Sequence, residues 1–141
     1  PTIGPDHRFS LMHAEDFARY AVALTTAEHA VGCIAEPDDG KTNGYTMAEV
    51  AAAAAPILGH AVRAVTIPKF VLKTFALLNE VTAPLVGAVP MVTRGKVDEI
   101  HHSDWVSDGS GSRLLPAFTP RFSLGEGLSH TLAWYRNEGW L

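Results

Sequence analysis

Histidine and carboxylate side chains are the groups in this chain best suited to metal binding or proton transfer. The 141-residue sequence has seven histidines, and the densest cluster is HHSD, with His101, His102 and Asp104. Metal-binding helices usually place two histidines one turn apart, as in H-E-x-x-H, so that both rings lie on one face. No HxxxH spacing occurs here, so we expect surface or capping histidines rather than a metal site.

Glycine motifs would mark a serine nucleophile or a phosphate-binding loop. The nearest match to G-x-S-x-G is Gly109-Ser110-Gly111, without the strand and helix that flank a nucleophile elbow. The pairs Gly109/Gly111 and Gly125/Gly127 lack the third glycine of a dinucleotide-binding loop, and neither follows a predicted strand. We expect a solvated loop for the first pair and close helix packing for the second, and no phosphate-binding loop in the chain.

The junction of the first predicted strand and helix holds His13 and Asp16. Ligands of open α/β sheets bind outside the carboxyl ends of the strands, which makes this junction a candidate ligand site. The alternative is that both side chains only cap the helix.

Alternating apolar segments and helix-start signals predict strands that alternate with helices. Thr46 with Glu49, and Ser123 with Glu126, have the spacing of capping boxes, and Gly59 and Gly139 suit the ends of those two helices. A further helix begins near Ala14, another near Pro68, and a short polar one follows Thr93. Strands are expected at 9–12, 31–35 and 61–67. This order favours an α/β or α+β fold.

Two segments are unusually apolar. Residues 68–90 would form a helical region with almost no polar face, which is typical of a buried helix or of one that lines a cavity or an interface. In the closing helix, Leu124, Leu128, Leu132 and Tyr135 form one stripe, and we expect Trp140 and Leu141 to anchor the tail into the body.

Composition sets the broad class of protein. The net charge of −4 argues against a nucleic-acid partner, and no basic run is present that would bind anionic lipid, so no membrane partner is expected. A single cysteine, Cys33, forms no internal disulfide. We expect residues 1–141 to be one unit and the protein to be cytoplasmic.

Two segments resemble a known family. RFSLMHAEDFARYAV, residues 8–22, resembles the R-x-F-I-H-V-D-D-L-A-x-A stretch of the extended short-chain dehydrogenase/reductase superfamily, NAD-dependent epimerase/dehydratase type. FSLGEGLSHTLAWYRNEGWL, residues 122–141, resembles that family's C-terminal sLeeGLrkTvdWYrenGwL. The order of elements between them also fits the family.

The resemblance implies that the chain is the C-terminal, substrate-binding half of such an enzyme, with the last part of a Rossmann-type sheet and a small helical domain. NAD or NADP would bind in the full-length enzyme and not to this chain alone. The family's catalytic Tyr-x-x-x-Lys is absent, so no catalytic residue is assigned and the isolated chain is expected to be inactive. Its partners would be a small-molecule substrate, the missing N-terminal Rossmann half and, through exposed apolar surface, other copies of itself.

By resemblance, the substrate-binding residues would be Arg8, His13, His102 and Trp105, and the substrate a sugar-like or small carbonyl or hydroxyl compound. Arg8 lies five residues before His13, whereas the arginine that contacts the diphosphate in sugar-nucleotide members lies four before. On a strand, this one-residue slip turns the side chain to the opposite face. The competing hypothesis is a self-standing, non-catalytic interaction domain that binds its partner through residues 68–90.

Overall fold

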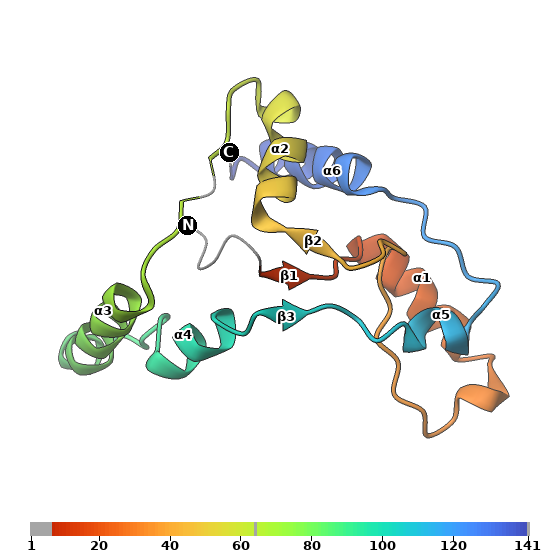
Figure 1. Cartoon of the computed structure of the whole chain (residues 1–141), viewed down its shortest axis with the longest axis horizontal. Coiled ribbons are helices and arrows are strands. Elements are labelled where there is room, and N and C mark those ends of the chain that lie inside the picture. The colour runs from red at the N-terminus through yellow and green to blue at the C-terminus, as the bar shows by residue number, and fades with distance from the viewer. Residues whose placement is uncertain (1–6, 64, 141) are drawn as a thin grey trace.

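A three-stranded sheet lies at the centre of the molecule, with helices grouped around it (Figure 1). The computed structural model describes residues 7–63 and 65–140. The strands are β1 (Arg8–Phe9), β2 (Tyr45–Thr46) and β3 (Asp104–Trp105), in the order β2-β1-β3. β1 is antiparallel to β2 and parallel to β3. The fold is therefore mixed α and β, with a small sheet.

Helix α1 (Ala14–Leu24) follows β1 and starts where the sequence predicts. Its N-cap is His13, whose Nδ1 accepts a hydrogen bond of 3.3 Å from the N–H of Glu15. A short 3-10 helix, η1 (Glu28–Ala30), comes next, and α5 (Ser110–Leu114) lies beside α1 (Figure 1). The Tyr20 hydroxyl links α1 to α5 by donating to the carbonyl of Gly111 at 2.9 Å.

Helices α2 (Met47–Leu58) and α6 (Leu124–Asn137) pack against each other. Both capping boxes form: the Thr46 and Ser123 hydroxyls accept from N–H groups in the first turn, and Glu49 and Glu126 accept from the N-cap N–H groups. Gly59 ends α2 in the left-handed region, at a φ of 73°, as the sequence predicts. These helix ends are fixed by local signals.

The remaining helices form a separate hairpin. α3 (Lys69–Thr82) runs directly into the 3-10 helix η2 (Ala83–Val86) and packs against α4 (Arg94–Ile100), which Thr93 caps as expected. The contact uses small buried side chains, Ala76 of α3 and Val97 of α4. In Figure 1 this hairpin lies on one side of the sheet, away from α1 and α5.

Two of the three predicted strands do not form. Residues 31–35 are irregular, and Val31 and Ile34 are 86% and 90% exposed. In the described part of 61–67, only an isolated bridge occurs, at Thr66. The first strand is Arg8–Phe9 rather than 9–12. A strand needs a partner as well as β-branched residues, and residues 31–35 form no ladder, while the described part of 61–67 pairs only through the single bridge at Thr66.

Two further expectations for the C-terminal part are wrong. The pair Gly109/Gly111, expected to lie in a solvated loop, lies instead at the start of α5, where Gly109 is the N-cap. Trp140, expected to anchor the tail into the body, is 69% exposed and stacks on Tyr135 of its own helix, with ring centroids 5.5 Å apart. Leu141 lies outside the described residues.

The capping box of α2 leads to a first prediction. Thr46→Ala removes the hydroxyl that accepts from the Glu49 N–H at 3.2 Å, so we expect the free energy of unfolding to fall by about 1 kcal/mol. Urea denaturation measures this change. Thr74→Ala is the control, because the Thr74 hydroxyl only donates to the carbonyl of Phe70 within α3, and it should cause no loss. Equal losses in both variants would contradict the prediction.

Candidate functional site

An apolar groove of about 240 Å³ lies between α1 and the segment that follows it. Four side chains of α1 line one wall: Phe17, Tyr20, Ala21 and Leu24. The other side consists of residues after α1 and one residue of α5: Ala27, Ala30, Val31, Cys33, Ala35, Pro37 and Leu114. The groove is smaller than a typical pocket for a drug-sized ligand and fits part of a larger molecule.

The polar atoms in the groove already have partners. The Tyr20 hydroxyl donates to the Gly111 carbonyl at 2.9 Å, and burial raises the pKa of Tyr20. The Cys33 thiol lies 3.7 Å from the carbonyl of His29, which accepts from it. None of the lining residues is charged. The side chains that line the groove are mostly apolar, so the groove offers contact surface mainly to a hydrocarbon.

Polar contacts hold the outer wall of the groove, which is the side opposite α1, in place. The N–H of Glu36 donates to the Ser110 hydroxyl at 2.8 Å, and the Glu36 carboxylate accepts from the N–H of Asp108 at 3.0 Å. Nearer to α1 in the sequence, a ring nitrogen of His29 lies 2.8 Å from the carbonyl of Leu114 in α5. These contacts join residues 29–36 to residues 108–114 and so fix the side of the groove that lies opposite α1.

A second, smaller cavity of about 150 Å³ lies where the end of β1 and the start of α1 meet α6. The His13 ring lines it and stacks on Phe122, with centroids 3.9 Å apart. Gly127 gives this ring its room, since a Cβ there would lie 3.3 Å from the His13 ring. The expected close packing is therefore confirmed for Gly127, whereas a Cβ on Gly125 would meet no atom within 4 Å.

His13 and His130 form a hydrogen-bonded pair at the rim of this cavity. His13 Nδ1 accepts from the Glu15 N–H, which leaves the proton on Nε2, 3.2 Å from His130 Nδ1. The His130 proton is then on Nε2, which faces the Glu15 carboxylate at 3.7 Å. These tautomers follow from the hydrogen-bond network. The pair places a polar group beside an otherwise apolar cavity.

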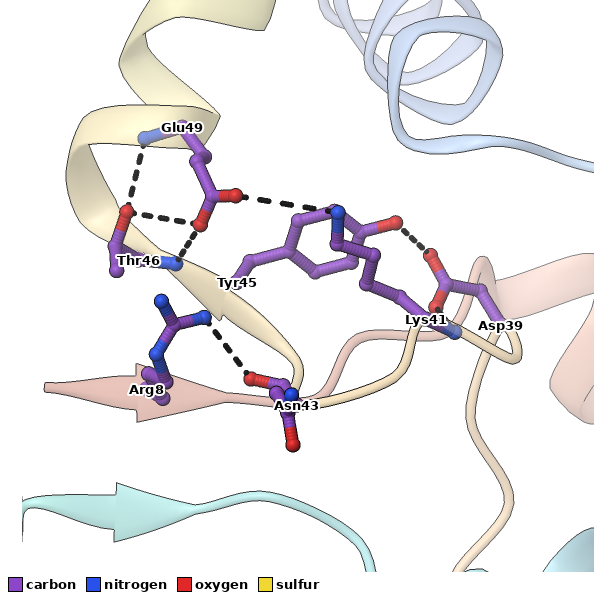
Figure 2. A network of polar contacts seen from close by, with 7 residues as sticks. All are labelled: Arg8, Asp39, Lys41, Asn43, Tyr45, Thr46 and Glu49. Carbon is purple, nitrogen blue, oxygen red and sulfur yellow. Dashed lines mark hydrogen bonds and ion pairs between the residues drawn. The ribbon is translucent and has the colours of Figure 1, made fainter.

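A polar network closes the region between β1 and α2, as Figure 2 shows. The Tyr45 hydroxyl donates to Asp39 at 2.5 Å, and Arg8 donates to the carbonyl of Asn43 at 3.2 Å. Burial, together with the hydrogen bond to Asp39, raises the pKa of Tyr45. The Tyr45 hydroxyl therefore links the segment at Asp39 to the start of α2 through this hydrogen bond.

Asp16, the other residue of the strand–helix junction, is structural. It does not cap α1, and its carboxylate is completely buried. One oxygen accepts from the N–H groups of Arg121 and Phe122, at 2.8 and 2.9 Å, and the other pairs with Arg19 at 2.6 Å. With its oxygens occupied, Asp16 is not free to bind a ligand, whereas His13 does face a cavity.

The other predicted substrate-binding residues lie at the sheet. His102 and Trp105 contact each other edge to face, with centroids 4.9 Å apart, and the Trp105 indole donates to the carbonyl of Glu99. Arg8 lies opposite Asp104 on the neighbouring strand, so Arg8 and Trp105 project from opposite faces. The structure thus brings His102 and Trp105 together and keeps them apart from Arg8. A substrate contact at any of these residues stays a prediction.

The groove itself was not predicted. The wall opposite α1 includes Val31, Cys33 and Ala35, which lie in the segment predicted to be a strand at 31–35. The sequence feature that could have indicated the groove is the number of small side chains between Ala27 and Ala35, which leave space beside a helix. Among the described residues, no group of three or more His, Cys, Asp or Glu could hold a metal ion.

Comparison with known proteins gives one informative relative. No family model and no solved structure matches the chain. The chain is 29% identical, over all of its 141 residues, to a protein named ceramide reductase from Caulobacter vibrioides (strain NA1000 / CB15N). The chain spans 43% of the length of that relative.

This relative corrects the expectation drawn from the resemblance. A ceramide reductase is not an NAD-dependent epimerase/dehydratase, so the assignment to that type of short-chain dehydrogenase/reductase is wrong. The expected sugar-like substrate is contradicted as well, and the competing hypothesis of a non-catalytic interaction domain receives no support.

Proposed function

We propose that this chain is the lipid-binding portion of a reductase that acts on ceramide-like substrates. The observation that carries the proposal is the match of the whole chain to a ceramide reductase, at 29% identity. Ceramides are amides with long hydrocarbon chains, so a protein that binds them needs an apolar surface without unpaired polar groups.

The groove beside α1 supplies such a surface. Its lining is uncharged, its two polar side chains are hydrogen-bonded within the protein, and part of it is open to solvent because Phe17 is 54% exposed. A volume of about 240 Å³ fits a segment of one hydrocarbon chain. The rest of the lipid would extend out of the groove.

The reducing part of the reaction belongs to this proposal too. The sequence has no glycine-rich dinucleotide loop, so NAD or NADP would bind to a part of the enzyme other than these 141 residues. The short sheet would then be the margin of a larger, Rossmann-type sheet. This chain would hold the lipid, and a reduced NAD or NADP bound to the other part of the enzyme would supply the hydride.

Filling the groove tests the proposal. Ala21→Trp places a large ring in the groove and excludes two or more methylene groups of the ligand, each of which contributes about 0.8 kcal/mol when buried. We expect the affinity for a fluorescent short-chain ceramide to fall about tenfold or more. Fluorescence anisotropy measures the affinity.

Ala18→Trp is the matched control. Ala18 is an exposed alanine of the same helix that does not line the groove, so this variant should bind ceramide as the unmodified chain does. Unchanged binding in Ala21→Trp, or failure of the unmodified chain to bind ceramide, would refute the proposed function.

A further inference from the structure

The hairpin of α3, η2 and α4 exposes a wide apolar surface. Its inner side is closed by Ala76, Ala83 and Val97, each at most 6% exposed. The outward side of α3 consists of large apolar side chains at least 43% exposed: Phe70, Val71, Phe75, Leu77, Leu78 and Val81. The surface continues along the chain through Leu85, Val89 and Met91. A soluble surface rarely carries so continuous an apolar patch without a partner.

The polar groups on this surface are satisfied within the helix. Thr74 donates its hydroxyl to the carbonyl of Phe70 at 2.9 Å, and Thr82 donates to the carbonyl of Leu78 at 2.8 Å. No side-chain hydroxyl of α3 is thus left needing water. This pattern suits contact with hydrocarbon, where an unpaired polar group is costly.

The edge of the apolar surface carries positive charge. Residues 69–100 hold four Lys and Arg side chains and three Asp and Glu side chains, a net charge of +1, whereas the whole chain carries −4. Lys69 and Lys73 lie at the edge of the apolar surface, each 2.9 Å from Asp98. Two lysines therefore share one carboxylate at this edge, and the excess positive charge is complementary to anionic lipid headgroups.

We propose that the outward face of α3, continued by residues 85–91, docks on the surface of an anionic bilayer. The apolar side chains would enter the boundary between headgroups and acyl chains, with the helix parallel to the membrane plane. No helix within 7–63 or 65–140 has the length and apolar character to span a bilayer. The sequence has no run of basic residues and predicts no membrane partner, whereas Lys69 and Lys73 lie one turn apart on α3, at the edge of the apolar surface.

The choice of a lipid surface over a protein surface rests in part on the proposed function, since a ceramide-like substrate resides in membranes. Docking through α3 would bring the chain to the place where that substrate is found.

Vesicle flotation tests the proposal with the chain and ceramide-free vesicles. We expect binding to phosphatidylcholine vesicles that contain phosphatidylglycerol, weaker binding to phosphatidylcholine alone, and weakening as salt is raised. The double variant Leu78→Ser/Val81→Ser should lower the partition coefficient about tenfold or more, because two buried side chains are lost from the bilayer. Both side chains are exposed, so circular dichroism should show an intact fold.

The matched control is Val22→Ser/Ile34→Ser, which removes two exposed aliphatic side chains from another part of the surface. It should bind vesicles as the unmodified chain does. The proposal is overturned if the unmodified chain does not float with anionic vesicles, or if both double variants lose binding equally. It is also overturned if sedimentation shows that the α3 face only joins two copies of the chain.

The experiments distinguish failure of membrane docking through α3 from failure of ceramide binding in the groove. Ala21→Trp alters the groove and not α3, so it should lose ceramide binding and keep vesicle binding. Vesicle binding without ceramide binding would leave the docking surface in place and refute the lipid-binding groove.

Discussion

Replacement of Asp16 by alanine is expected to lower the free energy of unfolding by about 3 kcal/mol or more. The carboxylate is fully buried and accepts from the N–H groups of Arg121 and Phe122, which lead into α6. Truncation leaves these two N–H groups and the Arg19 guanidinium without their acceptor. These donors are partly buried, and a donor left unpaired away from water costs more than its hydrogen bond contributes. Urea denaturation measures the loss.

The same carboxylate gives a pH dependence with a definite sign. Burial alone would raise the pKa of Asp16, but the hydrogen bonds from Phe122, Arg121 and Arg19 outweigh it, and the pKa lies below its ordinary value of 3.8. A carboxyl group with a lowered pKa contributes stability that is fully present above 3.8 and is lost as the pH falls through the folded-state value. Stability should thus decline at acid pH, and Asp16→Asn should lack that part of the decline.

Asp98→Asn is the control for Asp16. Asp98 also has a lowered pKa, of about 2, owing to its contacts with Lys69 and Lys73, but these groups are exposed. Solvent screens such pairs, so this variant should unfold close to the unmodified chain. If Asp16→Ala unfolds at the same urea concentration as Asp98→Asn, the hydrogen bonds of the Asp16 carboxylate do not stabilise the contact between α1 and the segment before α6.

The helix ends of this protein could be predicted because their causes lie within a few residues. Thr46 with Glu49, and Ser123 with Glu126, are each separated by one helical turn, so side chain and backbone meet as soon as the helix forms. Gly139 ends α6 for a similarly local reason, with a φ of 71° that glycine adopts readily.

The strands and the groove could not be predicted because their partners are distant in sequence. β1 pairs with β3, almost a hundred residues later, and nothing in residues 31–35 indicates that no strand lies beside them. The groove likewise depends on the contact between Tyr20 and Gly111. An apolar segment indicates burial or contact, but only the tertiary fold decides which.

The closing motif WYRNEGWL shows why local resemblance led to the wrong family type. In the structure it forms the end of α6: the N–H of Gly139 donates to Arg136 at 3.2 Å and that of Trp140 to Tyr135 at 2.9 Å, the paired bonds of a Schellman motif. The tryptophan then stacks on its own helix. Such a motif specifies how a helix ends and carries no information about the substrate, which is a property of the binding site.

Gly111→Ala is expected to damage stability and the groove together. A Cβ on Gly111 would lie 2.5 Å from Pro37 Cα and 2.9 Å from the carbonyl oxygen of Glu36. Both are backbone atoms, which do not rotate away as a flexible side chain would, so α5 and the wall at 36–37 must separate. Overpacking of this kind typically costs about 1–3 kcal/mol.

Separation of these segments also weakens the hydrogen bond from Tyr20 to the Gly111 carbonyl, at a further cost of about 1 kcal/mol. Pro37 and Leu114 line the groove, so their displacement should reduce the affinity for ceramide. We therefore expect Gly111→Ala to lose about 2–4 kcal/mol in urea denaturation and to bind the fluorescent ceramide more weakly.

Gly125→Ala provides the matched control. A Cβ there meets no atom within 4 Å, and the residue lies in the first turn of α6, so alanine should leave stability unchanged or raise it by about 0.5 kcal/mol. Ceramide binding should stay as in the unmodified chain, since Gly125 does not line the groove. If the two glycine variants behave alike, the close approach of α5 to Pro37 does not shape the groove, and its outer wall is held by other contacts.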